Sequence, residues 1–336
     1  MSEYSAPAPS KAIPAGQAHP GHLVRLFEAS FYPVIMSVTL GAGVYLAPLF
    51  AQSVLPWHVL FVILAAAFVI AVCERILPLF LGWNVARGDV RTDLLHALFS
   101  GAGTEEFTRL LLLGLATTYG SKLSAALGFV IWPRQWPILA QLLLFLVVAE
   151  FFQYWMHRCG HQWELLWRVH AVHHSPHRLY WLNAARFHPI EIALGVILMA
   201  LPPVILGAEP QVLSLVVIVT TVHGYTQHCN VRMRLGPLNY IVSSAPLHRW
   251  HHSLELEEAN NNYGATLICW DLVFRTFFFP KKRAPPEKIG IADFLQFFPK
   301  GYLGQLAAPF TWNRIHDRNR SSGRATTPSV STTNSR

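Results

Sequence analysis

The sequence predicts an all-α integral membrane protein in which helical hairpins cross a bilayer. Of its 336 residues, 52% are hydrophobic and only 13% are charged, with a mean hydropathy of +0.33. Soluble domains usually carry about 25% charged residues. The apolar residues also gather in stretches long enough to cross a hydrocarbon layer, and these stretches are spread evenly along the chain. The pattern therefore predicts one membrane domain with two short tails.

The N-terminal half predicts one tight hairpin and one further crossing. Residues 27–52 and 57–73 are each apolar and long enough to span, and little more than Leu55 and Pro56 separates them. We expect a third crossing at 110–131, although charged side chains interrupt the sequence around it.

The C-terminal half predicts a fourth crossing and a second hairpin. Residues 136–155 are apolar and end in an aromatic cluster of the kind found at headgroup level. Residues 189–207 and 211–226 follow, divided by a turn. An even number of crossings places residues 157–188 and 228–283 in one compartment.

Basic residues predict that this compartment is the cytosol. Lys281, Lys282, Arg283 and the tail after Arg314 carry the excess of positive charge expected on that side. The net charge of +8 fits lipid headgroups better than nucleic acid, since no basic block is interleaved with aromatic residues in a soluble module. The four cysteines are far apart and form no C-x-x-C pair, so no disulfide is expected.

Histidines are concentrated in the polar segments, because twelve of the seventeen lie between His157 and His252. HRCGH and the triplets HAVHH and HRWHH place imidazoles three and four residues apart, on one face of a helix. An H-x4-H pair ends the sixth predicted crossing. The isolated histidines are expected to be surface or hydrogen-bonded residues; they are His19, His58, His96 and His316.

The grouped histidines predict a metal centre. Ten imidazoles without a metal would leave buried polar groups poorly satisfied and would repel one another when protonated. Ten ligands exceed the four of one closed zinc site more than twofold, so we expect two ions. Imidazole suits zinc, copper, iron and nickel alike, so ligand type does not choose the metal.

These motifs, in this order and among hydrophobic spans, resemble the fatty acid hydroxylase and sterol desaturase superfamily. The likeness extends from about Tyr154 to Thr276 and includes NAARFHPIE, QHCN and NNNYGATLICWDLVFRT. It implies a membrane-bound non-haem di-iron oxygenase that hydroxylates or desaturates a lipid such as a sterol, alkyl lipid or fatty acyl chain. It further implies two iron ions, O2 as co-substrate, and electrons from a separate reductase, ferredoxin or cytochrome b5-type donor. The expected location is the bacterial inner membrane or the endoplasmic reticulum.

The resemblance also implies the site residues. The metal ligands would be His157, His161, His170, His173, His174, His223, His228, His248, His251 and His252. His188 would be a ligand or a partner of one. Glu150 would orient an imidazole or pair with Arg158 or Arg168. Five further residues would brace the site or cap loops: Asn183, Arg186, Asn230, Asn262 and Asp271.

The expected organisation is a tail at 1–26, a transmembrane region at 27–135, a fatty acid hydroxylase-like catalytic domain at 136–283 that forms a cytosolic di-metal cap, an extension at 284–318, and a tail at 319–336. The chain departs from the superfamily pattern at Arg275, where many relatives have glycine, and in the spacing of its H-x4-H pair. HPGH at His19 resembles a haem-binding segment of cytochrome b5, but the space before the first span is too short for that domain.

The sequence also leaves two alternative functions for the grouped histidines. A dizinc hydrolase would need a carboxylate base such as Glu164 or Glu191. A metal sensor or transporter would place histidines inside the spans.

Overall fold

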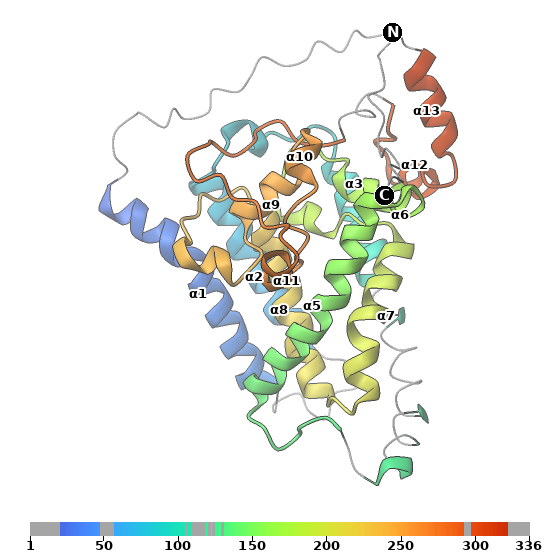
Figure 1. Cartoon of the computed structure of the whole chain (residues 1–336). Helices are drawn as coiled ribbons and strands as arrows, with labels where there is room; N and C mark the ends of the chain where they lie inside the picture. Colours follow the sequence, from blue (N-terminus) through green and yellow to red (C-terminus); the bar gives the residue numbers. More distant parts are fainter. Residues whose placement is uncertain are drawn as a thin grey trace.

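The computed structural model describes residues 21–47, 57–104, 107–108, 118–119, 122, 125–128, 131–291 and 297–321. Within these ranges the fold is all α, as predicted, and only isolated bridges occur in place of strands. Five long helices form the body of the molecule (Figure 1): α1 His22–Leu46, α2 Trp57–Ile76, α5 Ile138–Gln162, α7 Pro189–Ile205 and α8 Pro210–His228.

Three of these helices, α1, α2 and α5, are long and apolar enough to cross a membrane, and α7 is a shorter apolar helix. Their bounds differ from the predicted crossings by several residues. Helix α1 begins at His22, inside the segment expected to be a tail, and α5 continues past the expected end at 155 to Gln162. Most of the expected third crossing at 110–131 falls outside the described residues.

Helix α8 lies at the centre of the bundle. It packs against α1, α2 and α5, whose apolar side chains share its core clusters. The approach of α1 is close, because a Cβ atom placed on Gly43 would lie 2.7 Å from the Cδ1 atom of Ile218. Helix α7 is joined to α8 by a turn at Gly207, which has a φ of +101°, as the sequence indicated. Helix α7 nevertheless packs mainly against α5. The turn therefore joins α7 and α8 without packing them closely against each other.

Shorter elements cover the end of the bundle where α5 finishes, and Figure 1 shows α6, α9, α10, α12 and α13 gathered there. The elements are η2 Leu81–Asn84, α3 Val90–Leu95, the π-helix η3 His96–Gly103, α6 Glu164–His174, η4 Trp181–Ala185, η5 Gly236–Tyr240, α9 Ala245–His251, α10 Leu256–Ala259, α11 Cys269–Val273, α12 Tyr302–Ala307 and α13 Trp312–Ser321. We call this assembly the cap.

The departure at Arg275 has a direct structural consequence. Arg275 has a φ of +59°, in the left-handed region that favours glycine. The turn is held by the backbone N–H of Thr276, which donates to the carbonyl of Asp271 at 2.8 Å. This chain therefore keeps the turn with an arginine at a position where glycine would be free of strain.

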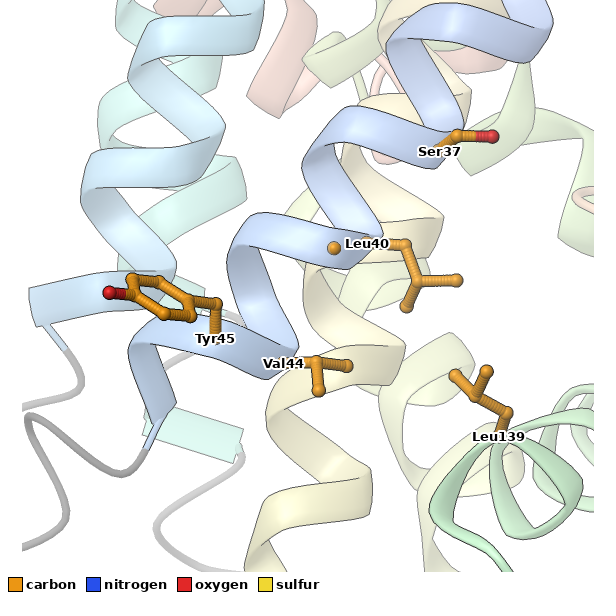
Figure 2. A pocket seen from close by; sticks show the side chains of 6 residues that line it. Ser37, Leu40, Val44, Tyr45 and Leu139 are labelled. Carbon is orange, nitrogen blue, oxygen red and sulfur yellow. The ribbon is translucent and has the colours of Figure 1, made fainter.

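An open apolar hollow of about 460 Å³ lies on the long helices, between α1 and the first turn of α5 (Figure 2). Its lining includes Leu40, Val44 and Leu139. Leu139 precedes His157 by eighteen residues on the same helix, which corresponds to about 27 Å along the axis. The hollow is therefore remote from the histidines of the cap.

Candidate metal centre

Nine of the ten histidines expected as ligands come together in two groups. In each group the nearest ring nitrogens all lie within 4.8 Å of one another. Group 1 consists of His157, His161, His170, His174 and His251, and group 2 consists of His173, His228, His248 and His252.

The helices α6 and α9 each supply ligands to both groups. On α6, His170 and His174 belong to group 1 and His173 belongs to group 2. Residues i and i+4 lie nearly above one another on an α-helix. The residue at i+3 lies on the other side of the line that joins them. The triplet on α9 is divided in the opposite sense, since His251 alone joins group 1. Each H-x-x-H-H motif thus contributes imidazoles to both groups.

The spacing of the nitrogens fits metal ions. The Nε2 atom of His174 lies 3.0 Å from that of His170 and 3.1 Å from that of His161. In group 2, the Nε2 atom of His248 lies 2.9 Å from those of His228 and His252. Two imidazole nitrogens bound at right angles, each about 2.1 Å from an ion, would be about 3.0 Å apart.

The chemical state of the imidazoles fits as well. The Nε2 atoms of His157 and His251 are buried and have no hydrogen-bond partner among the described residues, which is costly unless an ion accepts their lone pairs. Burial lowers the pKa of five cap histidines well below 6.5, so each is neutral and can act as a ligand; they are His173, His174, His248, His251 and His252.

Group 1 is oriented from outside by oxygen atoms. Four of its five imidazoles donate their Nδ1 hydrogen to an oxygen, which leaves Nε2 free to face the centre. The acceptors are the Tyr263 carbonyl for His157 at 2.7 Å, the Asn260 side chain for His161 at 3.2 Å, the Glu191 carboxylate for His170 at 2.5 Å and the Asn261 carbonyl for His251 at 2.8 Å.

Group 2 has weaker outer contacts. The Nδ1 atom of His228 donates to the Asn183 side chain at 3.0 Å, and that of His173 lies 3.3 Å from the Arg186 carbonyl. The Nδ1 atoms of His248 and His252 are buried and have no hydrogen-bond partner among the described residues. Within the described part of the chain, no carboxylate accepts a hydrogen bond from a group 2 imidazole.

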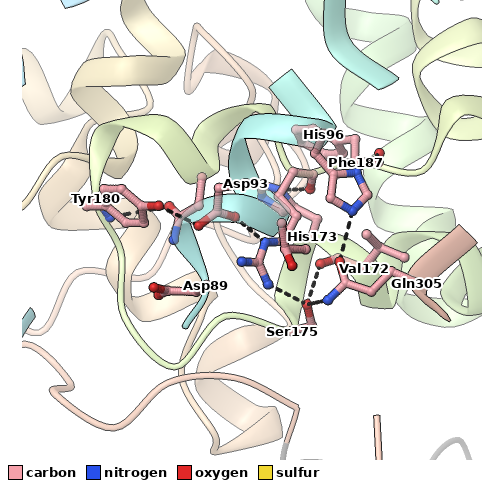
Figure 3. Close-up of polar contacts among 12 residues, drawn as sticks. Asp89, Asp93, His96, Val172, His173, Ser175, Tyr180, Phe187 and Gln305 are labelled. Carbon is pink, nitrogen blue, oxygen red and sulfur yellow. Dashed lines mark hydrogen bonds and ion pairs between the residues drawn. The ribbon is translucent and has the colours of Figure 1, made fainter. Parts of the chain in front are cut away.

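Polar contacts behind group 2 hold Arg186 in place (Figure 3). Its guanidinium pairs with the buried Asp93 carboxylate and donates to the Ser175 hydroxyl at 3.3 Å. Gln305 joins this network by donating to Ser175 at 3.3 Å and by accepting from His96 at 2.9 Å. His96 is thus a buried, hydrogen-bonded residue, as expected for an isolated histidine.

Two histidines of the predicted set lie outside both groups. His223 donates from Nε2 to the Ser243 carbonyl at 2.9 Å, and its Nδ1 accepts from the Tyr32 hydroxyl at 2.9 Å. His188 accepts from the backbone N–H of Ile190 and donates to the Leu306 carbonyl at 3.1 Å. Both ring nitrogens of each residue are therefore engaged, and the structure brings neither into a candidate metal site.

Glu150 does not contact an imidazole, and it does not pair with either arginine that was considered. Its carboxylate accepts the backbone N–H groups of residues 265–267 at 2.5–2.9 Å, where that loop passes α5. Asp271 similarly accepts from the N–H groups of Tyr263 and Gly264. These two carboxylates hold the loop whose Tyr263 carbonyl orients His157.

The two remaining asparagines also brace the backbone. Asn262 donates to the carbonyls of Leu247 and Phe278, and Asn230 exchanges hydrogen bonds with the backbone of Phe80. The side chain of Asn262 therefore supports α9 just before His248.

Two buried charged residues near group 2 were missed by the sequence analysis. One Glu74 oxygen, contributed by α2, accepts from the backbone N–H groups of Trp181 and Asn230, both at 2.8 Å. Arg249 on α9 donates to the carbonyls of Cys229 and Val231, both at 2.9 Å. Together they grip the loop that follows His228. The available signal for Glu74 was a carboxylate at the end of an apolar span, where charged residues are rare without a function.

The fold and the site together define a helical membrane protein with a candidate two-metal histidine centre in its cap. Comparison with known sequences identifies the relatives of such a protein. The profile of the family described as Fatty acid hydroxylase matches residues 142–276. Ornithine lipid hydroxylase OlsE from Rhizobium tropici is 38% identical over 283 residues, which cover 83% of each chain. The chain belongs to the fatty acid hydroxylase family.

More distant relatives match a smaller share of the chain. Human alkylglycerol monooxygenase is 30% identical over 129 residues, which are 38% of this chain and 28% of that protein. Methylsterol monooxygenase 2-2 from Arabidopsis thaliana is 28% identical over 139 residues, 41% of this chain and 52% of that protein. No solved structure matches. The chain is therefore an oxidoreductase, as the sequence predicted.

Proposed function

We propose that this protein hydroxylates a membrane lipid with molecular oxygen at two iron ions, held by the five histidines of group 1 and the four of group 2. The observation that carries the proposal is the convergence of nine imidazoles into two adjacent groups that share α6 and α9. The bound irons would supply the redox chemistry that activates oxygen and breaks a C–H bond.

The protein's own residues would hold and tune the two ions. The Glu191 carboxylate accepts the Nδ1 hydrogen of His170 at 2.5 Å, which makes the Nε2 atom of His170 a stronger ligand for a metal ion. Burial of His251, His252 and their neighbours keeps water away from the centre. His223 and His188 would act in the proposal as structural residues, because their ring nitrogens are already engaged.

A lipid substrate is supported by the position of the site and by the relatives. His157 and His161 lie in the last turns of α5, a helix of membrane length, so the centre would sit where the bilayer ends. The relative that covers 83% of the chain is named for ornithine lipid. We therefore propose an amino-acid-containing lipid, with ornithine lipid as the first to be tested, and hydroxylation as the outcome.

The proposal includes a multi-pass topology with the cap in the cytosol and a separate electron-transfer protein as donor. The exposed Lys281 and Lys282 support this orientation. The dizinc hydrolase is less well supported, because Glu164 is exposed and paired with Arg168 at 2.6 Å, and Glu191 accepts the outer Nδ1 hydrogen of His170, on the other side of that ring from its Nε2.

Metal analysis and oxygen uptake of the protein purified in lipid nanodiscs would test the proposal. We expect about two irons per chain, and reductant-dependent oxygen uptake that ornithine lipid stimulates and a phospholipid of matched acyl chains does not. The product should be heavier than ornithine lipid by one oxygen atom. Protein that contains zinc alone and consumes no oxygen with any reductant would overturn the proposal.

A further inference from the structure

We infer that Tyr263, Tyr154 and Trp155 form an oxidation relay, which carries oxidising equivalents from group 1 to the protein surface when oxygen is reduced without a lipid to hydroxylate. This inference rests on the proposed function, since it needs oxygen reduction at group 1. Its role would be protective, because a strong oxidant left at the centre would otherwise damage the histidines that hold it.

The relay begins at the centre with Tyr263. This buried ring lies 5.4–5.8 Å, between ring centroids, from three group 1 imidazoles: His157, His161 and His251. Tyrosine and tryptophan are the side chains that lose an electron most readily after the sulfur-containing ones. Tyr263 is therefore placed to pass an electron to the centre.

Two further aromatic residues extend the path to the surface. The buried ring of Tyr154 lies 5.9 Å from that of Tyr263, and the ring of Trp155 lies 5.5 Å from that of Tyr154. Trp155 is 36% exposed, whereas Tyr154 is fully buried. Every step is thus between rings in or near contact, and the last ring can meet a reductant from outside the protein.

Tyr154 has a proton acceptor in place, which distinguishes it from an ordinary core tyrosine. The Thr276 hydroxyl donates to the Asp271 carboxylate at 2.7 Å, so the Thr276 oxygen can accept from the Tyr154 hydroxyl at 3.0 Å. Arg158 also donates to the Tyr154 oxygen at 3.0 Å. Hydrogen bonds of this length are short enough for proton transfer. Oxidation of Tyr154 therefore need not leave a charged phenol in the core.

Reduction of one O2 to two waters takes four electrons and four protons; two reduced irons would supply two of the electrons, and two passes of the relay would supply the other two, with the four protons taken from solvent. In each pass, one electron leaves Tyr154 and crosses the ring of Tyr263 to the centre. The phenolic proton of Tyr154 moves to the Thr276 oxygen as the Thr276 hydroxyl proton moves to Asp271. Trp155 then returns an electron to Tyr154, the protons move back, and a soluble one-electron reductant such as ascorbate restores Trp155.

A second ring beside the centre provides an alternative path. Trp167 lies 5.3 Å from His161 and 5.5 Å from His174, and it is half-buried. We assign the relay to Tyr154 because its hydroxyl has the Thr276–Asp271 pair as proton acceptor. The experiment must separate the two routes.

The test uses the iron-loaded full-length protein, reduced and then mixed with oxygen in the absence of lipid. Freeze-quenched samples are examined by electron paramagnetic resonance for an organic radical, and oxygen consumed before half-inactivation is recorded. Wild type is compared with Tyr154→Phe, Trp155→Phe and Thr276→Val. Tyr240→Phe is the matched control, because Tyr240 stacks on Phe277 and its ring contacts none of the three relay residues.

We expect a radical in wild type and in Tyr240→Phe. Most of the signal should be lost in Tyr154→Phe and Thr276→Val, both of which should inactivate after severalfold fewer oxygen molecules. Trp155→Phe should retain a radical with the spectrum of tyrosine alone.

An unchanged radical and unchanged survival in Tyr154→Phe would overturn the relay, as would a signal that only Trp167→Phe removes. A wild-type protein that consumes oxygen but forms no radical would overturn the relay alone. A wild-type protein that consumes no oxygen at all would overturn the proposed function as well.

Discussion

Groups 1 and 2 are built from the same helices but differ in what surrounds them. Both take ligands from α6 and α9, yet α5 completes group 1 whereas α8 completes group 2. In group 1, a carboxylate and three neutral oxygens accept the outer ring hydrogens. In group 2, two neutral oxygens do so, and two outer nitrogens have no partner among the described residues.

This difference indicates that the two sites bind metal with unequal strength. A carboxylate that accepts the outer ring hydrogen raises the basicity of a ligating histidine. Group 1 is therefore expected to hold its ion more tightly, and group 2 to lose its ion first on treatment with a chelator. Metal content measured during a chelator titration would test this expectation. Simultaneous loss of both ions would contradict it.

Removal of one ligand from each group should have the largest effect. His251→Ala and His173→Ala should each lower lipid hydroxylation by more than about 100-fold, since losing a ligand costs more than losing an outer partner. Each variant should retain one metal ion, because the other group remains complete. Membrane insertion should be unchanged, as checked by carbonate extraction. Near-normal activity in both variants would contradict the assignment of the two groups.

Loss of the carboxylate behind group 1 should have an intermediate effect. Glu191→Gln should weaken metal binding at group 1 about 10–100-fold and leave group 2 unaffected, because only His170 loses its charged partner. The measurement is metal retention against a competing chelator. Glu164→Gln is the matched control, since that carboxylate is exposed and pairs only with Arg168. Equal losses from both groups would show that Glu191 supports the whole cap instead.

Replacing the Glu74 carboxylate, which lies near group 2, should have a smaller effect than the changes above. Glu74→Ala leaves the N–H groups of Trp181 and Asn230 without their acceptor, which should lower the free energy of unfolding by about 1–3 kcal/mol. Glu74→Gln retains an oxygen acceptor and should fall between the alanine variant and wild type. Thermal unfolding of the two variants would check the order, and a glutamine variant as weak as the alanine variant would point to the charge instead.

The smallest expected effect is on the pH dependence of the protein's stability. Burial lowers the pKa of His96 from 6.5 to about 4, so between these values the unfolded chain binds a proton that the folded protein does not. Stability should therefore fall as pH drops below 6.5, by about 1.4 kcal/mol per pH unit for this residue. His96→Gln should unfold with less pH dependence than wild type between pH 6.5 and 5.5. Parallel pH profiles would show that His96 contributes nothing to acid sensitivity.

Much of the site was predictable because its spacing is local. A helix places residues three and four positions apart on neighbouring lines, so the two H-x-x-H-H triplets indicated a shared pair of sites before any packing was known. The pairing of His157 with His161 on the extended α5 was predictable for the same reason. The resemblance placed His223 among the ligands beside His228, but the packing engages both of its ring nitrogens with Tyr32 and Ser243.

The sequence by itself determined the membrane character, the helical class and the spacing of the histidines within each motif, since each follows from composition or from spacing within one helix. The tertiary structure decided that nine of the ten expected histidines meet in two groups. It decided which ring nitrogen faces each centre. It also directed His223 to Tyr32 and Ser243, and it brought Glu191 to His170. It placed Glu74 against the loop after His228 as well. The physical reason is that these contacts join residues far apart in the chain, and only the packing of α2, α5, α7 and α8 brings them within hydrogen-bond distance.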